Sequence, residues 1–194
     1  AGAADNLVAE LSTNGVKVVA LQADSADSSA VQAAVTETVH QLGGVDILVN
    51  NAGIATLAPL ESLSLEEFDR MVAVNVRAVF VAIQAAVKHI TDGGRVITIG
   101  SVNGDSVPVA AGLSVYAMTK AAVAGLTRGL ARELGPRKIT INNLAVGPVA
   151  AGFAFVAALL ALFLMMRLLR SVNFTPYVIY RILLGAALLV YAYS

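Results

Sequence analysis

Tyr116 and Lys120 lie four residues apart in the stretch YAMTK, which combines a phenol with an ammonium group. On a helix, this spacing places both side chains on one face, one above the other. A free phenol titrates near pH ~10, and an adjacent positive charge lowers that pKa. The pair is therefore a candidate proton-transfer site, although an ordinary helix surface carrying a Tyr and a Lys explains the pattern as well.

A third polar group, Ser101, is predicted to reach the same place. It ends the apolar stretch of residues 94–101, and the helical stretch 114–134, which carries the Tyr and the Lys, follows after a loop. Ligands of open parallel sheets bind at the carboxyl ends of the strands. We therefore expect Ser101 Oγ, Tyr116 OH and Lys120 Nζ to converge there.

The elements that must position these groups alternate along the first 149 residues. Helical patterns cover residues 3–14, 28–44, 64–90 and 114–134. Strand patterns cover residues 16–24, 45–53, 94–101 and 138–149. Strands that are apolar throughout and alternate with helices are typical of parallel βαβ units covered on both faces. The predicted fold class is α/β.

Composition divides the chain into two parts. It is 57% hydrophobic and 13% charged, whereas soluble domains are ~45–50% apolar and ~25% charged. The excess lies after Val149, and no Asp or Glu follows Glu133. The predicted domains are residues 1–149 and 150–194.

Charge and cysteine usage exclude several classes of function. Thirteen basic and thirteen acidic residues balance, which argues against a nucleic-acid partner. The absence of cysteine excludes disulfides and Cys-ligated metal. His40 and His89, the two histidines, are too far apart in sequence to indicate a metal cluster.

Residues 1–149 resemble the short-chain dehydrogenase/reductase family, over roughly three quarters of the chain. The motifs, in the family's order and spacing, are NNAG at 50–53, Asn75, Ser101, YAMTK at 116–120 and GPV at 147–149. The resemblance implies a Rossmann-type doubly wound parallel sheet. It also implies an NAD(P)-dependent oxidoreductase that interconverts an alcohol and a carbonyl in a small-molecule substrate.

The resemblance implies four catalytic residues. Tyr116 is the general acid/base, and Lys120 lowers its pKa and holds the nicotinamide ribose hydroxyls. Ser101 donates a hydrogen bond to the reacting oxygen. Asn75 matches the family's helix-distorting asparagine, which holds a water for proton relay, although an asparagine bonded to its own helix backbone is the alternative.

The resemblance also implies a binding site for NAD or NADP. Its residues are Asp24, Asn50, Ala52, Gly53, Tyr116, Lys120, Gly147 and Val149. Asp24 matches the acid that contacts the adenine edge, but it is also a possible N-cap. Gly53 allows close backbone approach. A plain strand-ending turn is the alternative for residues 50–53.

The family's glycine-rich phosphate loop does not occur in the sequence, which begins without Met inside the family's second helix. We therefore expect a processed chain or a fragment. In the strand order 3-2-1-4-5-6, loss of the first strands leaves residues 16–24 without neighbours. Without the helix N-terminus that holds the pyrophosphate, tight NAD(P)H binding is not expected.

Residues 149–166 and 177–193 form two apolar stretches. The first has eighteen residues without a charge, long enough to cross a bilayer, and a connector with Arg167 and Arg170 follows. Together the stretches predict a two-helix transmembrane hairpin with the lipid bilayer as partner. Residues 152–185 resemble the C-terminal end of undecaprenyl-diphosphate phosphatase, but residues 150–194 contain no Asp, Glu or His to supply its catalytic groups.

The two apolar stretches predict that the chain is located in a membrane. The resemblance of residues 152–185 to the phosphatase implies that this is the bacterial inner membrane. The family places the dehydrogenase segment in the cytoplasm, whereas the positive-inside rule places the basic connector there instead. A homo-oligomer is compatible with the sequence. Two other interpretations stay open: a fragment of the membrane phosphatase, and a non-functional fusion of two gene fragments.

Overall fold

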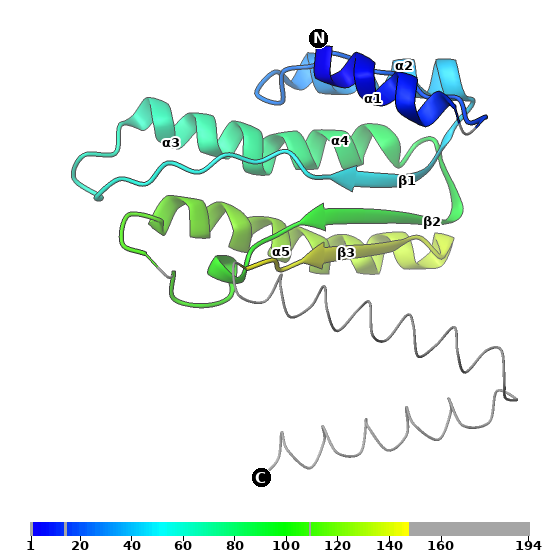
Figure 1. Cartoon of the computed structure of the whole chain (residues 1–194). Helices are drawn as coiled ribbons and strands as arrows, with labels where there is room; N and C mark the ends of the chain where they lie inside the picture. Colours follow the sequence, from blue (N-terminus) through cyan, green and yellow to red (C-terminus); the bar gives the residue numbers. More distant parts are fainter. Residues whose placement is uncertain (1, 14, 109, 148–194) are drawn as a thin grey trace, which may run out of the picture. The chain divides into compact units, whose positions relative to one another are not determined.

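The computed structural model describes residues 2–13, 15–108 and 110–147, and residues 1–147 form one compact unit (Figure 1). Its helices are α1 (Gly2–Ser12), α2 (Ser28–Leu42), α3 (Leu65–Val72), α4 (Ala78–Ala86) and α5 (Ser114–Leu134). Its strands are β1 (Val45–Asn50), β2 (Ile90–Ile99) and β3 (Thr140–Leu144).

The three strands form a parallel sheet in the order β1-β2-β3. Consecutive strands are neighbours, and helices lie between them in the chain, as βαβ units require. The predicted α/β class with a parallel sheet is confirmed.

The core lies between one face of the sheet and the helices α4 and α5. Val96 of β2 is fully buried, and Ile141, its register partner on β3, is 7% exposed. The cluster around them is Val79, Ile83, Ala86, Ile90, Val123, Leu134 and Ile139. Burial of this face by two helices fixes the sheet against α5, the helix of the candidate site.

The opposite face of the sheet is open in the described part of the chain. Ile47 and Val49 of β1 are 60% and 53% exposed, and Leu144 of β3 is 47% exposed. Our expectation that the strands are buried on both faces is therefore wrong for these residues. No described element covers this face, and an apolar pattern alone cannot bury it.

The strand predicted at residues 16–24 does not form. Residues 16–23 make no backbone hydrogen bond to another described residue. The pattern predicted β structure from β-branched composition, but a strand exists only through its ladder with a neighbour. In the described sheet, the strand nearest in sequence, β1, pairs only with β2.

The long helix predicted at 64–90 is divided. A π-helical segment, Ala73–Arg77, separates α3 from α4, and β2 begins at Ile90, four residues before the predicted strand. Figure 1 shows α3 and α4 as one continuous rod. The predicted start is confirmed, since the Ser64 hydroxyl accepts a 3.2 Å hydrogen bond from the Glu67 amide. Single π-helical turns inside α-helices are frequent at functional sites.

Asp27 begins α2 as its N-cap. Its carboxylate accepts hydrogen bonds from the backbone amides of Ser29 and Ala30. Hydrogen bonds from Ser29 and Ala30 lower the pKa of the Asp27 carboxyl. At the other end, Gly43 adopts the left-handed conformation that ends many helices.

Among residues 2–147, apart from 14 and 109, no helix has the length and hydropathy that crossing a membrane requires. The hairpin predicted at 149–166 and 177–193 lies outside the described residues.

Candidate active site

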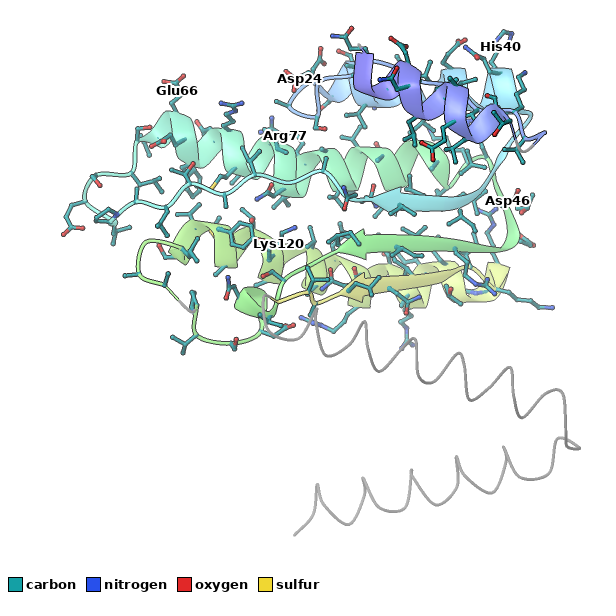
Figure 2. All side chains as sticks on the ribbon, in the orientation of Figure 1. Asp24, His40, Asp46, Glu66, Arg77 and Lys120 are labelled. Carbon is teal, nitrogen blue, oxygen red and sulfur yellow. The ribbon has the colours of Figure 1, made fainter. Side chains whose placement is uncertain are left out.

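Lys120 lies in the second turn of α5 with only 6% of its surface exposed. Its ammonium donates a 2.7 Å hydrogen bond to the carbonyl oxygen of Ile99, the last residue of β2. Among the described residues, no carboxylate lies within ion-pair distance of it. Burial lowers the pKa of the Lys120 ammonium, because the charged form loses hydration. Figure 2 shows Lys120 between α5 and the carboxyl end of β2.

The structure brings Tyr116 and Lys120 together. Lys120 Nζ lies 5.7 Å from the centroid of the Tyr116 ring, one helical turn earlier. This distance falls within the ~6 Å over which a cation is attracted to an aromatic face. The half-buried Tyr116 ring therefore lies next to the buried Lys120 ammonium.

Ser101 follows β2 and is 6% exposed. Its hydroxyl accepts a 3.2 Å hydrogen bond from the Asn103 amide and caps the 3₁₀ turn Val102–Gly104. The turn contacts α5 so closely that a Cβ on Gly104 would lie 2.8 Å from the backbone nitrogen of Ala121. This contact holds the end of β2 against the part of α5 that carries Lys120.

Asn75 lies in the π-helical segment and is 1% exposed. Its side-chain oxygen, Oδ1, accepts a 2.8 Å hydrogen bond from the Ile54 backbone amide. Its side-chain nitrogen, Nδ2, donates a 2.8 Å hydrogen bond to the Ile54 backbone carbonyl. Nδ2 also donates to Thr119 Oγ1 at 3.0 Å. The side chain therefore bonds a loop and α5, and the alternative that it bonds its own helix backbone is wrong.

Gly53 passes close to two of these residues. A Cβ at Gly53 would lie 3.4 Å from Lys120 Nζ and 3.5 Å from Asn75 Oδ1. Asn50, at the end of β1, donates from Nδ2 to Thr98 Oγ1 at 3.2 Å. Ala52, between them, is exposed. The absence of a side chain at Gly53 keeps the space beside the Lys120 ammonium open.

Of the remaining predicted binding residues, Gly147 lies near Ser101 and Asp24 does not. Asp24 accepts a 2.8 Å hydrogen bond from the Ala26 amide in the loop before α2, and Figure 2 shows it well separated from Lys120. Asp27 rather than Asp24 is the N-cap of α2, so that alternative is wrong. Gly147 contacts the turn after Ser101, since a Cβ there would lie 2.8 Å from a Val102 methyl group. Val149 lies outside the described residues.

Two buried polar residues of this region did not emerge from the sequence. Thr98 is 2% exposed and Thr119 is 0% exposed. Thr98 pairs in register with Asn50 on one side and Asn143 on the other. For Thr98, the sequence signal that could have found it is a polar residue at an inward-facing position of an otherwise apolar strand. Such a residue normally has a hydrogen-bond partner when it is buried.

A nicotinamide cofactor, which the family implies, fits these residues in part. Lys120 offers an ammonium without a carboxylate partner, beside the open space at Gly53, and this donor suits ribose hydroxyls. For the phosphate end, the family's glycine-rich loop does not occur in the sequence, so the residues present fit the nicotinamide–ribose end alone.

These features define an α/β protein with a tyrosine–lysine pair and a serine at the carboxyl end of a parallel strand. Residues 1–156 match the family described as short chain dehydrogenase, and the chain belongs to that family.

Curated relatives agree with this assignment. The short-chain dehydrogenase/reductase eriH of Hericium erinaceus is 43% identical over 148 residues, which is 74% of this chain and 58% of that protein. The cyclic-di-GMP-binding biofilm dispersal mediator protein of Escherichia coli is 44% identical over 126 residues, 65% of this chain and 51% of that protein. The chain thus spans between half and three fifths of these relatives.

Solved structures share the fold. A short-chain dehydrogenase/reductase from Serratia marcescens is 54% identical with a TM-score of 0.74, over 76% of this chain and 60% of that one. A short chain dehydrogenase from Burkholderia cenocepacia, in complex with NADP, is 49% identical with a TM-score of 0.73, over 75% and 59%. The Rossmann-type sheet implied by the resemblance is therefore supported. The family match ends at residue 156, and the likeness of residues 152–185 to the membrane phosphatase stays a prediction.

Proposed function

We propose that this chain carries the proton-transfer site of an NAD(P)-dependent oxidoreductase that interconverts an alcohol and a carbonyl. The observation that supports it most is the buried Lys120 ammonium beside the Tyr116 ring. A structural lysine would be expected to reach solvent or a carboxylate, because burying an unpaired charge is costly. Here the charge lies next to the one group whose ionised form it would stabilise.

Tyr116 exchanges the proton of the reacting oxygen. In the oxidation direction its phenolate accepts the proton of the substrate alcohol, and in reduction its phenol returns a proton to the carbonyl oxygen. Lys120 favours the phenolate electrostatically, since a positive charge in a poorly hydrated site acts more strongly than one in water. The Ile99 carbonyl holds the ammonium in place.

Ser101 and Asn75 support this step. The Ser101 hydroxyl already accepts a hydrogen bond from Asn103, so its proton is free to be donated to the substrate oxygen. Asn75 ties the loop after β1 to α5 through Ile54 and Thr119. It thereby positions Gly53 relative to Lys120, and a proton relay through a water held near Asn75 is part of the proposal.

A nicotinamide cofactor, when bound, supplies or accepts the hydride at the substrate carbon. Lys120, Asn50 and Gly53 would hold its nicotinamide–ribose end, and Gly147 and Val149 would line it. Asp24 would contact the adenine. Because the glycine-rich loop is not among the 194 residues, we propose that this chain binds NAD(P)H weakly and turns over slowly or not at all.

The test measures binding and proton transfer separately. NADPH fluorescence should show an affinity weaker than low-micromolar, and a low-micromolar dissociation constant would contradict the weak-binding proposal. A panel of alcohols and carbonyls is then assayed at high NADP or NADPH concentration. Any turnover should be lost in Tyr116→Phe and Lys120→Met and retained in Lys88→Met, an exposed lysine outside the site. Turnover that is retained in Tyr116→Phe would contradict the assignment of Tyr116 as the proton-transfer group.

For residues 150–194 we propose a membrane anchor, supported by the two apolar stretches and their basic connector. The lipid bilayer would then be a partner, and a bacterial inner membrane the location. The likeness to undecaprenyl-diphosphate phosphatase favours a second origin for this segment, a fragment of that enzyme. A fusion of two gene fragments accounts for both parts together, and sequencing across the codons for residues 140–160 tests it.

A further inference from the structure

Two loops border the candidate active site. The loop after β1, residues 51–64, passes Lys120, because a Cβ at Gly53 would lie 3.4 Å from the ammonium nitrogen. A second loop, residues 105–108 and 110–113, leads into α5, which carries Tyr116. Figure 1 shows both loops beyond the carboxyl ends of β1 and β2. A substrate whose oxygen reaches Tyr116 therefore lies beside both loops.

The two loops are joined by a backbone contact. The Ala58 amide donates a 3.2 Å hydrogen bond to the Gly112 carbonyl. Gly112 has a φ of +84°, and a Cβ there would lie 3.0 Å from the Ala58 backbone nitrogen, so glycine permits this close approach. Leu57 and Leu113 are the chain neighbours of these two residues. Leu57 is 66% exposed and Leu113 is half-buried three residues before Tyr116, so two apolar side chains flank the junction.

Neither loop carries a cation. From residue 54 to 65 and from residue 101 to 119, the sequence contains no Lys, Arg or His. The charged residues of these stretches are Glu61 and Asp105, and both are acidic. An anionic substrate would therefore meet only like charge on the loops, which is unfavourable. Burial of apolar substrate surface against Leu57 and Leu113 is favourable.

We propose that the substrate is an uncharged alcohol or carbonyl compound with an apolar body, and that Leu57 and Leu113 select it. The reacting oxygen lies at Ser101 and Tyr116, and the apolar body lies against the junction of the two loops. This inference rests on the proposed proton-transfer function, because Tyr116 fixes where the reacting oxygen lies.

The experiment compares two alcohols of the same shape, para-methylbenzyl alcohol and para-carboxybenzyl alcohol, which differ by a methyl group against a carboxylate. Saturation-transfer NMR measures both dissociation constants for the full chain in non-ionic detergent. NADP is present at high concentration, and dialysis fixes the free concentration of each alcohol. We expect the methyl compound to bind more tightly by about tenfold or more. Equal affinities, tighter binding of the carboxylate, or no saturable binding of the methyl compound would overturn the proposal.

A charge introduced at Leu57 tests its role in selection. Leu57→Lys should strengthen binding of the carboxylate and weaken binding of the methyl compound, so that the ratio of their dissociation constants changes about fivefold or more. Leu7→Lys, at a leucine of α1 that is 54% exposed and outside both loops, should leave the ratio unchanged. An unchanged ratio in Leu57→Lys, or the same change in Leu7→Lys, would refute the role of Leu57. Binding is measured without turnover, so failure of the proposed function appears separately, as turnover retained in Tyr116→Phe.

Discussion

The side-chain amide of Asn75 donates a 3.0 Å hydrogen bond to the hydroxyl of Thr119, which lies 44 residues later in the chain. Thr119 in turn donates a 2.7 Å hydrogen bond to the carbonyl oxygen of Tyr116. The π-helical segment is thereby connected to the turn of α5 that carries the tyrosine–lysine pair. The helix distortion and the candidate proton-transfer site are parts of one hydrogen-bonded unit.

Replacing Thr119 with Val should disrupt this unit. The substitution keeps the shape but leaves Nδ2 of the buried Asn75 with one partner fewer, which costs about 1–3 kcal/mol of unfolding free energy. Chemical denaturation measures it. Thr119→Ser, which retains the hydroxyl, should lose clearly less, and a Val variant as stable as the Ser variant would show that the link contributes nothing.

Replacing Lys120 with Met should change how stability depends on pH. Burial lowers the pKa of Lys120 below its ordinary value of 10.5, so between the two values the unfolded chain binds more protons than the folded chain. The Lys120 contribution therefore makes unfolding free energy rise with pH across this interval. Lys120→Met should lack that rise in denaturation curves recorded at alkaline pH. The exposed Lys88→Met serves as control, and loss of the same rise in that variant would contradict the assignment.

Gly104→Ala should destabilise the contact between the turn after Ser101 and α5. The added methyl group would lie 2.8 Å from backbone atoms of Lys120 and Ala121, which cannot rotate away. Overpacking of this kind costs about 1–3 kcal/mol. Gly129→Ala, in α5, meets no atom within 4 Å and should raise stability by up to ~1 kcal/mol, because alanine is the better helix former. Equal thermal midpoints for the two variants would argue against the close contact.

Residues 149–166 and 177–193 are predicted to insert in a bilayer. After expression in bacteria, the chain should stay in the membrane pellet on alkaline carbonate extraction. Ala158→Arg, near the middle of the first stretch, should shift the chain out of the pellet, since a central Arg costs ~2.5–3.5 kcal/mol on insertion scales. Ala158→Leu should not. Recovery of the unaltered chain as a monodisperse species in the soluble fraction would refute the prediction.

The sequence by itself determined most of the local structure in residues 1–147. Apolar periodicity and capping residues predicted α2, α5 and the three strands that form, because these signals act within a few residues. The spacing of Tyr116 and Lys120 predicted their common helix face for the same reason. The tail's composition marked it as physically different from the rest of the chain.

The tertiary structure decided what depends on distant partners. Residues 16–24 have the composition of a strand but form none, since a strand needs a neighbour to complete its hydrogen bonds. Asn75 finds its partners in Ile54 and Thr119, which no local pattern indicates. The burial of Lys120, which lowers its pKa, likewise arises only when β2 and α5 pack together, because desolvation is a property of the assembled fold.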